Sequence, residues 1–230
     1  MLIQALNITK IFKKGDTETL ALDKVSFSIK KGEYVTVMGP SGSGKSTLMH
    51  IIGLLDIPTS GDYLLEDKQV NKLSKNELAR IRNKKIGFVF QSFNLLSRAT
   101  ALENVMLPMI YGGISILERK KRASILLTNI GLQDRLEHTS NQLSGGEMQR
   151  VAISRALAMN PEIIVADEPT GNIDSKQGAE IMNIFDTLNK AGHTIILITH
   201  DAEVARHAKR IIKLQDGKIV YDGKPVGTEI

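Results

Sequence analysis

Residues 39–46 read Gly-Pro-Ser-Gly-Ser-Gly-Lys-Ser, and this segment constrains the fold of the 230-residue chain more than any other. It matches the pattern G-x-x-x-x-G-K-S in full. The apolar run 34–38 before it predicts a buried strand, and residues 46–55 after it predict a helix. Strand, glycine-rich loop and helix form one half of a βαβ unit, so we expect a parallel α/β sheet.

The composition of this loop suits the binding of a polyphosphate. Glycines let the backbone wrap closely around the anion, turn successive N–H groups inward and lead into the positive end of the next helix. Lys45 is expected to reach the β- and γ-phosphate oxygens, and the Ser46 hydroxyl to ligate Mg²⁺. The expected phosphate-binding residues are Gly39, Pro40, Ser41, Gly42, Ser43, Gly44, Lys45, Ser46 and Thr47.

The remaining elements are predicted from apolar periodicity. Val25, Phe27 and Ile29 alternate with serines, which is typical of a half-buried strand, whereas residues 92–158 show helical spacing. Further strands are predicted at 86–90, 163–166, 194–199 and 210–214, a helix at 175–191, and a hairpin turn at Asp216-Gly217 leading into 218–221. We therefore expect one domain over 1–230, with an α/β core at 1–91 and 159–230 and an inserted helical subdomain at 92–158.

Composition excludes several classes of protein. With no cysteine, the chain holds no disulfide, thiolate metal site or cysteine nucleophile. No apolar run approaches the roughly 20 residues that a membrane-spanning helix needs, so the cytosol is the expected location. The net charge of +5 and the basic clusters at 10–14, 82–85 and 119–122 are compatible with nucleic acid or an anionic membrane surface. A solvated basic face is favoured, because only 4% of residues are aromatic, which leaves few rings to stack on bases.

Polar residues follow three of the predicted strands. Asp167 and Glu168 end the strand at 163–166, where the carboxyl end of a parallel strand faces the ligand crevice. Asp167 suits Mg²⁺, and Glu168 suits the deprotonation of an attacking water. His200 and Gln91 end two further strands and are expected at the same crevice, with the Gln91 amide touching Mg²⁺ or the lytic water.

Residues 143–150, Leu-Ser-Gly-Gly-Glu-Met-Gln-Arg, resemble the signature motif of ATP-binding cassette (ABC) ATPases. With this motif the whole chain is similar to that family, in the order phosphate loop, Gln91, signature, Asp167-Glu168, Asp174 and His200. The resemblance implies a RecA-like P-loop NTPase fold of class α/β. It adds an N-terminal antiparallel β part to the parallel core and its helical insertion.

The resemblance also implies roles that composition and spacing do not give. Ser144, Gly145, Gly146 and Glu147 would close over the γ-phosphate of an ATP held by a second copy, so that two ATP molecules lie in a head-to-tail homodimer. Asp174 would contact the opposing subunit, and His200 the γ-phosphate. Phe12 stands where the family often has a tyrosine that stacks on adenine, and Glu147 stands where glutamine is common.

Residues 88–96, 101–105 and 166–171 are similar to the MacB/LolD-like branch, which serves macrolide and peptide export or lipoprotein release. The expected function is an ATP-hydrolysing motor on the inner face of the cell membrane. A separate transmembrane permease would be gripped by the helical insertion, and no nucleic acid is expected. The alternatives are a nucleic-acid-associated ABC ATPase in repair or translation, and a non-hydrolysing regulatory module. A non-hydrolysing module is disfavoured, because the residues expected to act in hydrolysis are intact: Lys45, Asp167, Glu168 and His200.

Overall fold

The computed structural model describes residues 1–225, so the last five residues of the predicted domain lie outside the described residues. The chain forms two compact units. Unit 1 holds residues 1–79 and the chain from Asn189 onward, and unit 2 holds Arg80–Leu188. This division follows packing, whereas the predicted division into a core and a helical subdomain follows the change to helical spacing at 92–158 and stays a prediction. No helix in the described part of the chain has the length and apolar character needed to span a membrane.

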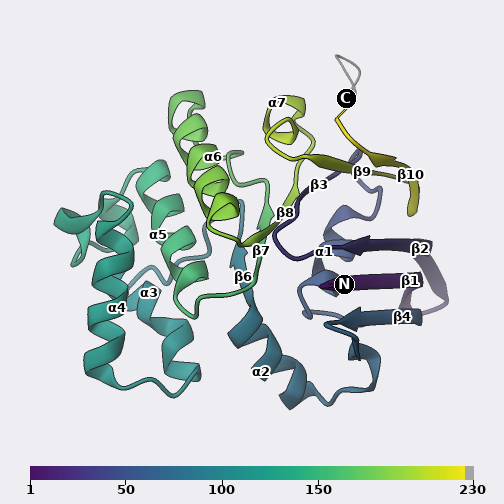
Figure 1. The fold of residues 1–230 in the computed structure, drawn as a ribbon, viewed down its shortest axis with the longest axis horizontal. Helices are drawn as coiled ribbons and strands as arrows, with labels where there is room; N and C mark the ends of the chain where they lie inside the picture. The colour runs from purple at the N-terminus through teal and green to yellow at the C-terminus, as the bar shows by residue number, and fades with distance from the viewer. Residues whose placement is uncertain (226–230) are drawn as a thin grey trace. The chain divides into compact units, whose positions relative to one another are not determined.

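Unit 1 begins with a small antiparallel sheet, whose strands β1, β2 and β4 lie side by side in Figure 1. The strand order is β2-β1-β4-β5, and Ile3 pairs with Ile29 on β2 and with Leu65 on β4. The predicted N-terminal antiparallel part is confirmed. Its strands are β1 (Ile3–Lys14), β2 (Thr17–Ile29), β4 (Ser60–Leu65) and β5 (Lys68–Gln69).

The second sheet of unit 1 carries the glycine-rich loop. Its strands run β10-β9-β3-β8, where β3 is parallel to both β8 and β9, and β10 is antiparallel to β9. All five residues of β3, which lies between β8 and β9, are buried, as expected of a central parallel strand, and all five residues of β8 are buried too. The elements are β3 (Tyr34–Met38), α1 (Lys45–Ile52), β8 (Thr194–Ile198), α7 (Ala202–Ala205), β9 (Arg210–Gln215) and β10 (Lys218–Gly223).

The predicted strand at 34–38 is confirmed, but the predicted helix at 46–55 ends early. Helix α1 stops at Ile52, because Gly53 caps it and Leu54 takes a positive φ of 57°. The chain passes into unit 2 within α2 (Lys75–Lys85), after the 3₁₀ helix at Val70–Lys72.

Unit 2 combines two parallel strands with a packed group of helices, as the region 92–158 predicts. Its core is formed by apolar faces of the helices and includes Val105, Met109, Leu127 and Val151. Its elements are β6 (Ile86–Val89), α3 (Ala101–Tyr111), α4 (Ile116–Thr128), α5 (Gly145–Leu157), β7 (Ile163–Asp167), α6 (Ser175–Lys190) and the 3₁₀ helices Gln133–Arg135 and Ser140–Gln142. Strands β6 and β7 are parallel, with Ile86 beside Ile163.

Candidate functional site: a phosphate loop and a signature helix

The glycine-rich loop of unit 1 connects the buried strand β3 directly to helix α1. Within it, the Ser43 amide donates a hydrogen bond to the Pro40 carbonyl over 3.2 Å, which closes a tight turn. Gly44 is the N-cap of α1 and has a φ of 100°, a left-handed conformation that suits glycine. No side chain caps this helix, so its first N–H groups are available to an anion.

Lys45 folds back over the loop. Its ammonium group donates to the Gly39 and Pro40 carbonyl oxygens, each over 2.7 Å. The lysine charge therefore lies beside the backbone that is predicted to cradle the phosphates. Ser46 is exposed and Thr47 is partly exposed on the first turn of α1.

The other predicted site residues of unit 1 are His200 and Phe12. His200 is exposed and follows β8 in a turn that Thr199 fastens to β3, since the Thr199 amide donates to the Val37 carbonyl over 3.2 Å. The Thr199 hydroxyl accepts from the Asp201 amide over 3.0 Å. Phe12 lies on β1 with 44% of its surface exposed, and the Lys10 ammonium lies 5.1 Å from its ring centroid. This ring is accessible to a stacking partner.

Unit 2 holds Gln91, Asp167 and Glu168. Asp167 is the last residue of β7, and Glu168 follows it with a positive φ of 43°. The turn is closed by the Gly171 amide, which donates to the Glu168 carbonyl over 3.0 Å. The Gln91 amide lies against Gly171, where an added Cβ would come within 2.8 Å of Nε2. The structure therefore brings Gln91 to the loop that begins at Glu168, within one unit.

The signature residues cap helix α5. The Ser144 hydroxyl accepts from the Glu147 amide over 3.3 Å, and the Glu147 carboxylate accepts from the Ser144 amide over 2.8 Å, a reciprocal capping box. The Arg135 Nε donates to the second carboxylate oxygen over 2.9 Å. The amides of Gly145 and Gly146 are the first-turn donors outside this box.

The charge of Glu147 is stabilised where it lies. The Ser144 amide, followed by the Arg135 guanidinium, holds the pKa of Glu147 below its ordinary value of 4.5. Glu147 lines an open pocket of about 580 Å³ with Ser144, Gly146 and Asp174. The Asp174 carboxylate accepts from the Gln177 amide over 2.9 Å and so caps α6. This pocket combines helix-terminal donors with charged side chains.

Sequence reasoning missed three residues that position this part of unit 2. Arg135 holds Glu147, and Gln149, which is fully buried on α5, donates to the Pro169 carbonyl over 2.7 Å. Arg155, also on α5, donates to the Phe93 and Asn94 carbonyls over 2.7 and 2.5 Å. No pattern in the sequence names the partners of these long polar side chains.

Comparison with known proteins decides the family. The family model described as "ABC transporter" matches residues 22–171, which include the phosphate loop, the signature and the Asp167-Glu168 pair. The chain belongs to the ABC transporter family. It is an ATP-binding cassette with an ABC ATPase domain, and the predicted P-loop NTPase fold is confirmed.

Curated relatives of this cassette fall into two lengths. An uncharacterized ABC transporter ATP-binding protein of Thermotoga maritima is 52% identical over 94% of this chain and 93% of its own. The macrolide export ATP-binding/permease protein MacB of Chlorobaculum tepidum is 51% identical over 97% of this chain, but over 34% of its own. The cassette thus spans about a third of the MacB relatives.

Solved structures agree with the fold. The cassette MJ0796, described as a dimeric post-hydrolysis state bound to ADP and Pi, has a TM-score of 0.90 and 49% identity, covering 98% of this chain and 99% of its own. A second dimeric structure of MJ0796 matches with the same TM-score of 0.90 at 50% identity. These similarities support ATP binding by the present chain.

Proposed function

We propose that this cassette is the ATP-hydrolysing motor of a transporter that exports a substrate or extracts it from the membrane. Lys45 and the amides of 39–46 bind the phosphates, Glu168 deprotonates the attacking water, and His200 contacts the γ-phosphate. Gln91 orients the water or touches Mg²⁺. The proposal is carried by one observation: a complete phosphate loop and a complete signature helix stand in a single chain that is 49% identical to MJ0796.

We propose Mg²⁺ as the metal that accompanies ATP, on the chemistry of three residues. The exposed Ser46 hydroxyl, the Gln91 amide oxygen and the Asp167 carboxylate are hard oxygen donors, and Mg²⁺ prefers a few such protein ligands together with substrate phosphates. Bound Mg²⁺ would offset the charge of the β- and γ-phosphate oxygens. The protein residues position it and the water.

We propose that two copies form an ATP-closed head-to-tail homodimer. The open pocket at Ser144 has backbone donors at the start of α5, and these suit an anion offered by another molecule. The dimeric state of MJ0796 supports this arrangement. Because ATP would complete the interface, ligand binding and association are linked.

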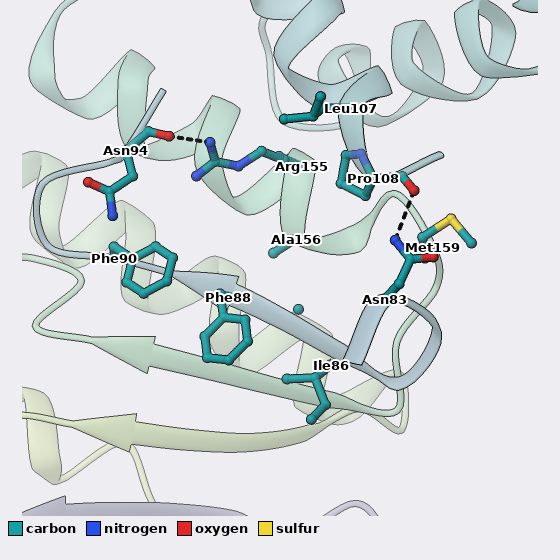
Figure 2. A pocket seen from close by; sticks show the side chains of 11 residues that line it. Asn83, Ile86, Phe88, Phe90, Asn94, Leu107, Pro108, Arg155, Ala156 and Met159 are labelled. Carbon is teal, nitrogen blue, oxygen red and sulfur yellow. Dashed lines mark hydrogen bonds between the residues drawn. The ribbon is translucent and has the colours of Figure 1, made fainter. Parts of the chain in front are cut away.

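The membrane partner is proposed to dock in a groove of unit 2. The side chains that line this groove are shown in Figure 2: Phe88 of β6, Phe90 directly after β6, and Leu107 and Pro108 of α3. Its volume is about 230 Å³. The two phenyl rings are stacked with centroids 5.4 Å apart, and the Asn83 amide donates to the Pro108 carbonyl over 2.9 Å. An apolar trough with polar ends suits an amphipathic helix. The MacB relatives are named ATP-binding/permease proteins, which supports a permease as the protein that contributes this helix. Such a location is peripheral on the inner face of the membrane.

Two measurements test the motor. Purified cassette should hydrolyse ATP in the presence of Mg²⁺, and Glu168→Gln should lower kcat by about 10²–10⁴-fold, because a general base is lost.

Since the chain has no cysteine, Leu107→Cys offers a unique crosslinking site in the groove. Crosslinking in native membranes should capture an integral membrane protein. Leu20→Cys, on the antiparallel sheet, is the matched control and should not.

A further inference from the structure

The turn between β9 and β10 holds one buried residue, Gly217, although Asp216 before it is exposed. Asp216 and Gly217 both have positive φ, 48° and 75°, as in the two-residue turns that suit Asp-Gly. Loops of this kind normally face solvent, yet Gly217 is buried. Its neighbours explain the burial: Ala21 of β2 lies on one side and the phosphate loop on the other.

Backbone hydrogen bonds fix this turn to both neighbours. The Gly217 amide donates to the Ser43 carbonyl over 3.1 Å, and the Gly217 carbonyl accepts from the Asp23 amide over 2.9 Å. The Lys218 ammonium and the Asp23 carboxylate form an ion pair at 3.2 Å across the same contact. Ser43 itself is 2% exposed. The turn is thus a bridge between β2 and the phosphate loop.

The start of the loop also touches this hairpin. A Cβ added at Gly39 would lie 2.1 Å from the Leu214 carbonyl oxygen of β9, so only glycine fits there. The loop therefore meets β9 at its first residue and the β9–β10 turn at Ser43.

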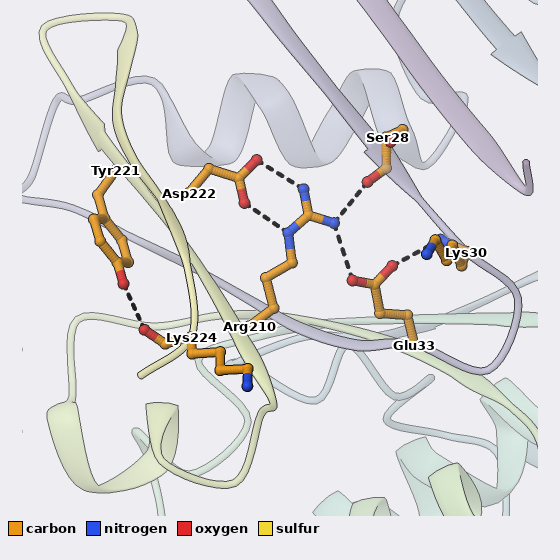
Figure 3. A network of polar contacts seen from close by, with 7 residues as sticks. All are labelled: Ser28, Lys30, Glu33, Arg210, Tyr221, Asp222 and Lys224. Atoms are coloured by element: carbon orange, nitrogen blue, oxygen red, sulfur yellow. Dashed lines mark hydrogen bonds and ion pairs between the residues drawn. The ribbon is translucent and has the colours of Figure 1, made fainter. Parts of the chain in front are cut away.

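The far end of the hairpin is clamped as well. Figure 3 shows the Arg210 guanidinium between Asp222, Glu33 and Ser28. It donates to both Asp222 carboxylate oxygens, over 2.6 and 2.7 Å, to Glu33 over 2.9 Å and to the Ser28 carbonyl over 2.8 Å. The Asp222 carboxylate raises the pKa of Arg210, so the clamp stays charged. The hairpin is held at both ends.

The hydrogen bond from Gly217 to the Ser43 carbonyl also fixes the orientation of the Ser43–Gly44 peptide. A trans peptide is planar, with its C=O and N–H pointing in opposite directions. Because Gly217 holds the Ser43 carbonyl, it also sets the direction of the Gly44 N–H, which points away from the hairpin. Gly44 is the N-cap of α1, where the phosphates are proposed to bind.

We propose that the Asp216-Gly217 turn is a positioning element for nucleotide binding, in which the Gly217 amide holds the Ser43–Gly44 peptide with its N–H aimed at the nucleotide phosphates. The inference rests on the proposed phosphate-binding role of residues 39–46. Gly217 touches no nucleotide in this scheme and acts through the loop.

Hydrogen exchange on the wild-type chain tests phosphate binding by 39–46 and positioning by Gly217 separately. ADP with Mg²⁺ should slow amide exchange in 39–46, as the proposed function requires. If Gly217 positions the loop, ADP with Mg²⁺ should also slow exchange of the Gly217 amide at least fivefold. If 39–46 does not respond, the proposed function fails. If 39–46 responds and Gly217 does not, the positioning inference is overturned.

A matched pair of glycine variants gives the second measurement. In Gly217→Ala the new Cβ would lie 2.9 Å from the Ala21 carbonyl oxygen and push the turn from Ser43. We expect the Kd for ADP and the KM for ATP to rise about tenfold, with a smaller change in kcat. Gly15→Ala is the control, since Gly15 is a hairpin-turn glycine with a φ of 59° and no atom within 4 Å of its added Cβ. Equal Kd values for a folded Gly217→Ala and Gly15→Ala would overturn the inference. Should Gly217→Ala not fold, the exchange measurement decides.

Discussion

The Nη2 atom of Arg155 donates a hydrogen bond to the Phe93 carbonyl oxygen over 2.7 Å. The Nη1 atom of Arg155 donates to the Asn94 carbonyl oxygen. Phe93 and Asn94 both have positive φ, 60° and 50° respectively. Helix α5, which begins at the signature, therefore holds the strained segment that follows Gln91. This segment lines the proposed docking groove (Figure 2).

Arg155→Met should destabilise the chain, because two carbonyl groups in a strained segment lose their donors. We expect a loss of about 1–3 kcal/mol in the free energy of unfolding, measured by urea denaturation. The control is Arg122→Met, which removes an exposed pair with Glu118 at 3.3 Å and should change stability by less than about 0.5 kcal/mol. Equal losses in the two variants would contradict the anchoring role.

The cap of α5 should make stability depend on pH. The folded-state pKa of Glu147 is lowered, so the stabilisation is complete above the ordinary value of 4.5 and is lost as pH falls through the folded value. Wild type should exceed Glu147→Gln in Tm at pH 7, and the gap in Tm should shrink as the pH falls below 4.5. A gap that stays constant over this range would show that the carboxylate charge plays no part.

Gln149→Leu should impair catalysis more than binding. It removes the buried hydrogen bond to Pro169, the residue after Glu168, and so loosens the proposed base. We expect kcat to fall about tenfold while the KM for ATP changes less than twofold, since misplacement of a catalytic group acts on the chemical step. Gln133→Leu, at an exposed position, should leave both constants unchanged. A rise in KM alone would contradict the positioning of Glu168.

Phe12→Ala should weaken ATP binding by removing a stacking surface. Base stacking is worth about 1–3 kcal/mol, which corresponds to roughly 5- to 150-fold in Kd. Phe12→Tyr should bind as wild type does, and Leu20→Ala, exposed on the neighbouring strand, should have no effect. Inorganic triphosphate lacks the base, so its Kd should not change in Phe12→Ala. Weakening of both ligands would argue against adenine stacking.

The sequence predicted those features that side-chain type or spacing encodes. The strand at Tyr34–Met38, the helix that starts beside Lys45 and the Asp216-Gly217 turn all lie where the patterns place them. The burial of Gly217 was not predictable, because its bond to Ser43 joins two backbone groups far apart in the chain. Gln149 and Arg155 were missed for a related reason: a polar residue on an amphipathic helix is normally read as solvent-exposed. The division into core and helical subdomain stays a prediction.

The central claim is that Ser144 of one copy serves ATP bound by another, and light scattering on Glu168→Gln tests it most directly. The swap slows hydrolysis, so ATP with Mg²⁺ should convert monomer to dimer. Adding Ser144→Arg should abolish dimer formation while binding of a fluorescent ATP analogue persists. Glu168→Gln that binds ATP and stays monomeric, or a dimer that forms equally well with Ser144→Arg, would contradict the shared site.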